Sequence, residues 1–305
     1  MNALLVTGTG ANAAYSGLGL QPDLVVIKSR SAVGRFDWFD SVRGPTIRLD
    51  SSTTEAEAAD NDVFGFDADG FQGNLNNGTT YVAWGWKESA TAGFDIVTYT
   101  GTGANRTVAH SLGVAPSMMI IKRRDAVDQW WVYSNQLANT QYLQLNLTNA
   151  AQTSSTLWNS TSPTSSVFSL GVNNANTNTG TYVAYLFAEV AGYSKFGKYT
   201  GNGSADGPFI HLGFRPRWIM FKSTSTGGVG YGWSIYDTER DTYNQNINPL
   251  NANASAAEST TSTFAIDLVS NGIKLRGLNQ NINQSGVTYV YAAFAENPYK
   301  YSLAR

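Results

Sequence analysis

The sequence Thr7-Gly8-Thr9-Gly10 recurs along the chain as Thr100-Gly101-Thr102-Gly103 and, with asparagine in third place, as Thr200-Gly201-Asn202-Gly203. A Leu-Gly-x-x-Pro motif follows each copy, at residues 18–22, 112–116 and 212–216. Two motifs that return in the same order at a spacing of about 100 residues indicate an internal repeat. This repeat decides the architecture before any single strand is considered.

Three further landmarks follow the proline in every copy. An apolar run that ends in lysine occupies residues 24–28, 118–122 and 218–222, and aromatic segments lie at residues 36–40, 130–134 and 233–237. Each copy closes on a Thr-Tyr-Val strand, at residues 80–86, 181–187 and 288–294. A unit of this length can bury a core of its own, unlike the shorter unit of a solenoid. The sequence therefore predicts three domains in a row, at residues 1–91, 92–191 and 192–305, the last with a short C-terminal tail.

The local pattern within each repeat favours strands. Short runs of β-branched and aromatic residues lie between turns rich in glycine, proline and asparagine. We therefore predict an all-β fold of three tandem antiparallel, jelly-roll-like β-sandwich repeats of about 100 residues. One or two helical turns are expected at residues 53–59 and, more weakly, at residues 254–258.

The charge balance excludes several classes of partner. Charged residues make up 14% of the 305 residues, and 20 basic against 22 acidic side chains leave a net charge of −2. Nucleic-acid binding needs a basic stripe that neutralises several phosphates, which this chain lacks. No apolar run approaches the length of a membrane-spanning helix, and the first residues lack the basic start of a secretory signal. We expect no nucleic-acid partner and no membrane insertion.

The residue types needed for cofactor chemistry are scarce. The chain has no cysteine, which excludes disulfides, thiolate nucleophiles and cysteine-bound zinc. The Gly-rich motifs lack both the Lys-Ser/Thr of a phosphate-binding loop and the βαβ setting of a dinucleotide fingerprint. The glycines are better explained by turns with positive φ. No cofactor is therefore expected.

No catalytic residue is predicted either. His110 and His211 each precede a Leu-Gly turn, a placement that favours hydrogen bonding to the backbone. Glu88, Glu189 and Glu296 end the three closing strands, one per repeat, and are interpreted as edge or interface charges. A glycosidase would need two carboxyl groups about 5 to 9 Å apart at one site. The chain is therefore not expected to be an enzyme.

The one metal-site candidate is weak. Asp67 and Asp69 lie in an acidic stretch of the first repeat that resembles a calcium loop. Its spacing does not supply the alternating ligands and the glutamate at the twelfth position of an EF-hand. Since Asp69-Gly70 is also a good tight-turn dipeptide, a solvated hairpin turn is the better interpretation and calcium the weaker one.

The aromatic residues raise the question of sugar binding, because flat rings stack on sugar faces. Trp38, Trp130 and Trp233 recur in the aromatic segments and are interpreted as equivalent core residues of the three sandwiches. Trp158 and Tyr142 have no aromatic counterpart in the other repeats. These two are the candidates for an exposed surface contact.

The repeat motifs together resemble a domain found in virion structural proteins of tailed bacteriophages. The resemblance rests on Tyr-Thr-Gly-Asn-Gly, Leu-Gly-Phe-x-Pro, the apolar strand that ends in lysine and a later Gly-x-Thr-Tyr-Val-Ala, and it covers nearly the whole chain. Such domains also carry an Asp-Ser-Val-Arg-Gly piece, matched here by residues 40–44 of the first repeat alone. The resemblance implies a particle component and supplies no catalytic residues.

The expected function is that of a non-enzymatic virion protein, assembled in the bacterial cytoplasm as part of a tail fibre, spike or appendage. It would display loops to a host-surface glycan or to other virion proteins. A capsid decoration or head-fibre protein is the first alternative, and a tandem carbohydrate-binding module is the second. Because fibres are commonly trimeric, a homotrimer is favoured, although a chain of three domains could also imitate a trimer alone.

Overall fold

The computed structural model of the chain describes residues 1–297, so the tail predicted at the C-terminus lies largely outside the described residues. Nearly all regular structure is strand, and the strands of the large sheets pair antiparallel. The predicted all-β fold is therefore confirmed. Below, the first, second and third segments are residues 1–91, 92–191 and 192–297.

Each segment contributes one large sheet, and the strand order of the three sheets corresponds. The first sheet runs β1 (Asn2–Thr7), β9 (Thr80–Trp86), β3 (Leu24–Ser29), β4 (Phe36–Asp40), β5 (Gly44–Asp50) and β6 (Ala58–Ala59). The second runs β10 (Phe94–Thr100), β17 (Thr181–Phe187), β12 (Met118–Arg123), β13 (Trp130–Ser134), β14 (Gln141–Gln144) and β15 (Gln152–Thr153). The third runs β18 (Ser194–Thr200), β25 (Thr288–Ala295), β20 (Pro216–Ser223), β21 (Ser234–Asp237) and β22 (Leu250–Asn251).

A smaller sheet accompanies each large one. The small sheets are β2 (Ala13–Ser16), β8 (Gly70–Gly73) and β7 (Gly65–Asp67); β11 (Arg106–Ala109) and β16 (Val167–Leu170); and β19 (Phe209–His211), β24 (Gly272–Leu275) and β23 (Ile266–Val269). The helical elements of the described residues are α1 (Gln280–Asn283) and the 3₁₀ turns η1 (Asn174–Asn176) and η2 (Ser262–Phe264). None of these helical elements is long and apolar enough to cross a membrane.

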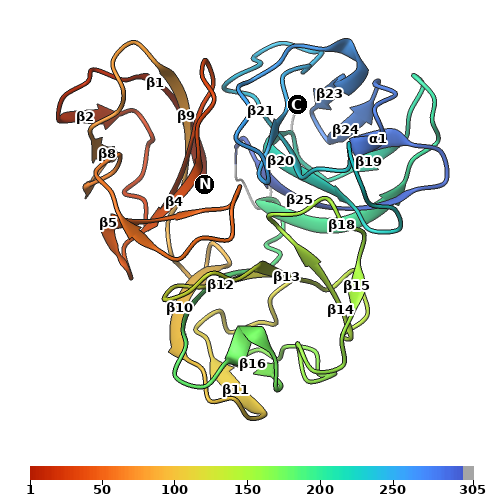
Figure 1. Ribbon diagram of the computed structural model, residues 1–305. Helices are drawn as coiled ribbons and strands as arrows, with labels where there is room; N and C mark the ends of the chain where they lie inside the picture. The colour runs from red at the N-terminus through yellow and green to blue at the C-terminus, as the bar shows by residue number, and fades with distance from the viewer. Residues whose placement is uncertain (298–305) are drawn as a thin grey trace.

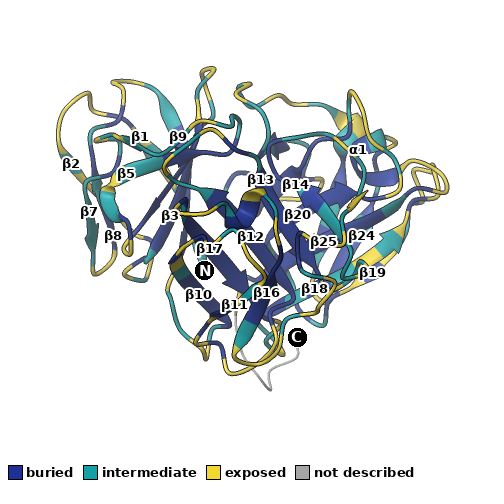
Figure 2. Ribbon diagram, turned by 60° about the horizontal axis from the view of Figure 1, so that its bottom comes forward, coloured by how far each residue is buried: buried dark blue, intermediate teal, exposed yellow. Residues whose placement is uncertain are grey.

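The large sheets are buried on both faces. In β3, Val25 and Ile27 pack toward the small sheet of their own segment, whereas Leu24 and Val26 belong to a different core. A strand with two buried faces needs an unbroken apolar run, and this explains the Leu-Val-Val-Ile sequence of β3. Figure 2 shows the buried strands inside the molecule and the exposed loops around its rim.

The second core lies where the three segments meet, and Figure 1 shows them as three lobes around a common centre. Trp86 and Phe187 end β9 and β17, and Phe294 is the next-to-last residue of β25. Their rings form a triangle with centroid separations of 6.3, 5.9 and 6.0 Å. The sequence predicts three domains in a row. In the structure, residues of all three segments fill one apolar core.

Buried lysines join the segments in a ring. The lysine at the end of each apolar run donates from Nζ to a backbone carbonyl of another segment at 3.0–3.1 Å: Lys122 to Thr54, Lys222 to Thr148 and Lys28 to Ser255. The lysine side chains are almost completely buried. Burial lowers the pKa of Lys28 and Lys122 to about 8 and that of Lys222 to about 7.

The same ring explains why two helical turns predicted from the sequence do not form. Residues 53–59 and 254–258 contain no helix in the structure, and Ala58–Ala59 forms β6. Their backbone groups pair with the neighbouring segment, since the Thr54 carbonyl also accepts from Asp128 N at 2.9 Å. Tertiary contacts therefore override the local helix preference.

The Asp-Ser-Val-Arg piece of the first segment forms a buried ion pair. Arg43 Nε lies 2.6 Å from Asp40 Oδ2, and both side chains are fully buried. The sequence suggests that only the first repeat keeps this piece, but Asp237 and Arg240 form the same pair at 2.6 Å in the third segment. The spacing of aspartate and arginine is therefore retained there, although the residues between them differ.

Each of these aspartates also accepts a hydrogen bond from another segment. Tyr185 Oη donates to Asp40 Oδ2 at 2.7 Å, and Trp84 Nε1 donates to Asp237 Oδ2 at 3.0 Å. By strand register, the corresponding acceptor position in the second segment is Ser134, and the corresponding donor position in the third segment is Ala292. The third junction thus has neither the aromatic donor nor the carboxylate acceptor of the other two.

The predicted core tryptophans are buried, and Trp130 and Trp233 occupy equivalent positions, but Trp38 does not. The strand register places Phe36 opposite Lys28 and Trp130 opposite Lys122. Phe36 is therefore the counterpart of Trp130, and Trp38 lies two residues further along its strand. All three predicted tryptophans lie in the shared central core rather than inside separate sandwiches.

Candidate functional site

A polar cleft of about 230 Å³ opens in the first segment. Its lining combines polar side chains with short apolar ones. The polar side chains are those of Ser29, Arg35, Asp37, Asp62, Asn76, Thr79 and Tyr81, and the apolar ones are those of Ile27, Ala32 and Val33. The cleft thus combines charged, hydroxyl and aliphatic groups in one enclosed space.

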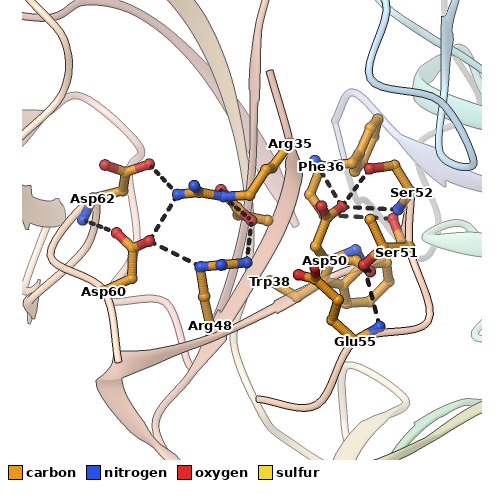
Figure 3. Close-up of polar contacts among 12 residues, drawn as sticks. Arg35, Phe36, Trp38, Arg48, Asp50, Ser51, Ser52, Glu55, Asp60 and Asp62 are labelled. Atoms are coloured by element: carbon orange, nitrogen blue, oxygen red, sulfur yellow. Dashed lines mark hydrogen bonds and ion pairs between the residues drawn. The ribbon is translucent and has the colours of Figure 1, made fainter. Parts of the chain in front are cut away.

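Arg35 organises the charged groups of this site, as Figure 3 shows. Its Nε lies 3.1 Å from Asp37 Oδ2, and its Nη2 lies 2.7 Å from Asp60 and 3.4 Å from Asp62. Arg48 adds a second cation, with Nε 2.9 Å from Asp60 and Nη1 3.9 Å from Asp37. The result is a network of three carboxylates and two guanidinium groups.

The strand pattern of the first segment places the carboxylate of Asp37 at this site. Asp37 is in β4 opposite Ile27, between Phe36 and Trp38, which belong to the central core. Since successive side chains of a strand point to opposite faces, Asp37 faces the interior of its own sandwich. The corresponding position in the second segment, opposite Ile121, is Trp131. The first segment therefore has a carboxylate where the second has a large aromatic ring.

A second exchange changes the surroundings of Tyr81, which lines the cleft. Tyr99 stacks on Tyr182 with a centroid separation of 4.9 Å, and Tyr199 stacks on Tyr289 at 5.0 Å. The strand register places Val6 at the matching position, opposite Tyr81. Tyr81 consequently lacks the ring that covers its counterparts in the other two segments.

Burial changes the acidity of the site. It raises the pKa of Asp37 to about 7, against the opposing effect of the Arg35 charge. Burial, together with the nearby Asp60, also raises the pKa of Asp62. The Arg35 side chain stays 42% exposed while that of Asp37 is 6% exposed, so the arginine forms the mouth of the cleft and the aspartate its floor. This arrangement offers fixed donors and acceptors side by side, which suits recognition of a polar ligand.

The two calcium candidates, Asp67 and Asp69, accept hydrogen bonds within the first segment. Asp69 follows β7 in the predicted hairpin turn, and its carboxylate accepts from Gly19 N at 2.5 Å and from Gly17 N at 3.1 Å. Asp67 accepts from Gln72 Nε2 at 2.8 Å. Residues 1–297 hold no group of three or more His, Asp or Glu side chains arranged to bind a metal ion. The structure therefore places Asp67 and Asp69 in a hairpin that anchors the loop before β3.

The two predicted contact residues have different environments. Trp158 is 1% exposed, so its prediction as a surface contact is wrong. Its ring packs edge-on against Tyr133, and its Nε1 donates to the Gln141 carbonyl at 3.0 Å. The ring had no counterpart in the other repeats because it fills the interior of this sandwich alone.

Tyr142 is partly exposed and lines a hollow of about 260 Å³ beside Trp131. Asn173 also lines this hollow. Its NH₂ group already donates to three backbone carbonyls, those of Thr156, Leu157 and Gly171. This hollow therefore has an aromatic wall, and its lining contains no charged residue, unlike that of the cleft of the first segment.

Trp158→Phe is expected to lower the free energy of unfolding by about 1–2 kcal/mol, because it removes a buried hydrogen bond and part of a packed ring. Urea unfolding followed by fluorescence and circular dichroism measures this change. Tyr142→Phe is the matched control, since it removes only a hydroxyl from a partly exposed ring. Equal stability of the Trp158→Phe variant and the wild type would contradict the structural role.

The remaining predicted residues serve the backbone or the surface. His110 Nε2 lies 3.2 Å from the Thr164 carbonyl, as the sequence predicts for a turn histidine, whereas His211 is exposed on β19. Glu88 and Glu189 accept from the Ile96 and Phe196 amides at 3.3 and 3.2 Å. Glu296 pairs with Arg215 at 2.6 Å. The structure thus places the three glutamates apart, each within its own edge contact.

These features define a class of all-β protein in which three antiparallel sandwiches share one core and the first sandwich contains a charged cleft. The chain matches, over residues 1–298, a family described as a domain of unknown function, DUF7483. It therefore belongs to this family. The match spans all three segments, so the family corresponds to the whole three-segment body. No curated protein and no solved structure matches the chain.

Proposed function

We propose that this chain is a non-enzymatic structural protein of a tailed-phage virion, most simply a tail-fibre, spike or appendage component. The observation that supports the proposal best is the shared aromatic core. Trp86, Phe187 and Phe294 join the three segments into one body, whose loops lie around the outside. A rigid body with outward loops suits display to a host surface or to a neighbouring virion protein. The phage resemblance of the repeat motifs supplies the virion setting.

The same core bears on the oligomeric state. In a fibre trimer, three chains pack around a central axis and bury their apolar surfaces against one another. Here the three segments of one chain already pack around a common apolar core. This favours the alternative in which the chain imitates a trimer alone over the expected homotrimer. We expect a mass near 32.9 kDa in sedimentation experiments. A stable species of three times that mass would contradict the monomeric form and restore the homotrimer.

Immunogold labelling of purified phage particles tests the proposed location. We expect antibody against this chain to label the tail or its fibres in electron micrographs. Label spread over the head would favour a capsid decoration or head-fibre protein and contradict the appendage assignment. Particles without label, from a stock in which the chain is expressed, would overturn the virion assignment and favour a free carbohydrate-binding module.

A further inference from the structure

We infer that the cleft of the first segment binds a neutral, polyhydroxylated ligand of the size of a single sugar ring. The inference rests on the proposed function in one respect, because a virion surface protein meets host glycans. It adds a site and a ligand class to that function. Three properties of the cleft support it: its difference from the other two segments, its charge and its size.

The lining of the cleft distinguishes the first segment from its two counterparts. At the position of Val6 the other segments carry Tyr99 and Tyr199, and at the position of Asp37 the second segment carries Trp131. The third segment has Ser234 at the position of Asp37, so the carboxylate belongs to the first segment alone. In the first segment Asp37 and Tyr81 line an open cleft together with other charged and hydroxyl groups. The second segment has a hollow without charged residues beside Trp131, so the charged lining is a property of the first segment rather than of the shared fold.

The charges select against ionic ligands. An anion that approaches Arg35 also meets the carboxylates of Asp37 and Asp62, both of which line the cleft. A cation meets Arg35 at the mouth, and the guanidinium of Arg35 already forms ion pairs with the carboxylates of Asp37 and Asp60. A hydroxyl group both donates and accepts, so adjacent hydroxyls can bridge a carboxylate and a guanidinium without net charge.

Size and shape fit a small ring. The volume of about 230 Å³ lies below the ~300–1,000 Å³ of pockets for drug-sized molecules. Ile27 and Val33 add aliphatic surface to the lining of the cleft. A sugar ring has hydroxyl edges and C–H faces, so it can contact both the polar and the aliphatic surface at once.

Saturation-transfer NMR on the full chain with a panel of methyl glycosides tests the inference. The probes are the methyl glycosides of glucose, galactose, mannose, rhamnose and N-acetylglucosamine. We expect at least one probe to bind with a dissociation constant on the order of 1 mM. Ala32→Trp places a large ring at the exposed rim of the cleft and is expected to abolish transfer. Asp62→Ala removes one acceptor and is expected to weaken binding by about tenfold.

Glu239→Ala is the control, since Glu239 pairs with Arg217 on the third segment, outside the cleft. This variant should bind as the wild type does. No transfer to any probe, or equal binding by wild type and the Ala32→Trp variant, would overturn the inference. Circular dichroism of each variant shows that a lost signal is not lost folding.

The outcomes separate this inference from the proposed function. Glycoside binding by a chain that labels no particle would support the cleft and overturn the virion assignment. Labelled particles without glycoside binding would support the virion assignment and overturn the cleft as a binding site. Hydrolysis of a bound glycoside, visible in the same spectra, would support the ligand class and contradict a non-enzymatic role.

Discussion

Asp40→Ala is expected to lower the free energy of unfolding by about 3–5 kcal/mol, because it removes the nearer of the two carboxylates that face a buried arginine and leaves only Glu57 at 3.6 Å. The Arg43 side chain is fully buried, and its Nε lies 2.6 Å from Asp40. The substitution also removes the acceptor for Tyr185 Oη, which comes from the second segment. A single change therefore disturbs one ion pair and one junction between segments. Urea unfolding gives the change in free energy.

Two variants make this prediction specific. Ser134→Ala changes the matching position of the second segment, where no ion pair exists, and is expected to cost at most about 1 kcal/mol. The double variant Asp40→Ala, Arg43→Met removes both charges and is expected to recover a large part of the loss, since no unpaired charge stays buried. A loss for Asp40→Ala no larger than that for Ser134→Ala would contradict the role of the pair.

The repeat motifs carry most of the information about the sheets. The apolar run, the aromatic segment and the Thr-Tyr-Val strand of each copy form β3, β4 and β9 or their counterparts. The shared core was missed, although the runs contain its signal. A strand with one solvated face alternates between apolar and polar residues, whereas residues 24–27 are apolar throughout. Such a run in an antiparallel sheet requires a second apolar partner, which here is the rest of the chain.

The charged cleft was missed for a different reason. Arg35, Arg48 and Asp60 lie far apart in sequence, and only the sheet brings their side chains together. The available signal lies in the comparison of copies: the strand register sets Asp37 against an aromatic residue of the second segment. Comparing tryptophans by type hid this difference, because it matched Trp38 with Trp130 and shifted the strand by two residues. A departure from the repeat at a buried position was more informative than any recurring residue.

The buried lysine ring gives the wild-type protein a stability that rises with pH. Burial lowers the pKa of Lys222 to about 7 in the folded chain, whereas an unfolded lysine has a pKa of about 10.4. Between these values the unfolded chain binds a proton that the folded chain does not. The free energy of unfolding therefore rises with pH in this window, by up to about 1.4 kcal/mol per pH unit for each such lysine. Below pH 7 both states are protonated, and this contribution to the slope is absent.

Lys222→Met is expected to remove one lysine's share of this rise, while Lys28 and Lys122 continue to contribute above pH 8. Urea unfolding at intervals from pH 6 to pH 9.5 measures the slope, below the range where tyrosine ionisation favours the unfolded chain. Lys195→Met is the control, because this lysine lies at the surface beside Glu189. If the Lys222→Met and wild-type curves run parallel, the amine of Lys222 does not change its proton affinity on folding. If the wild-type chain loses stability relative to the variant toward low pH, protonation of the buried Lys222 amine opposes folding, and the closed arrangement of three segments is most stable where its lysines are neutral.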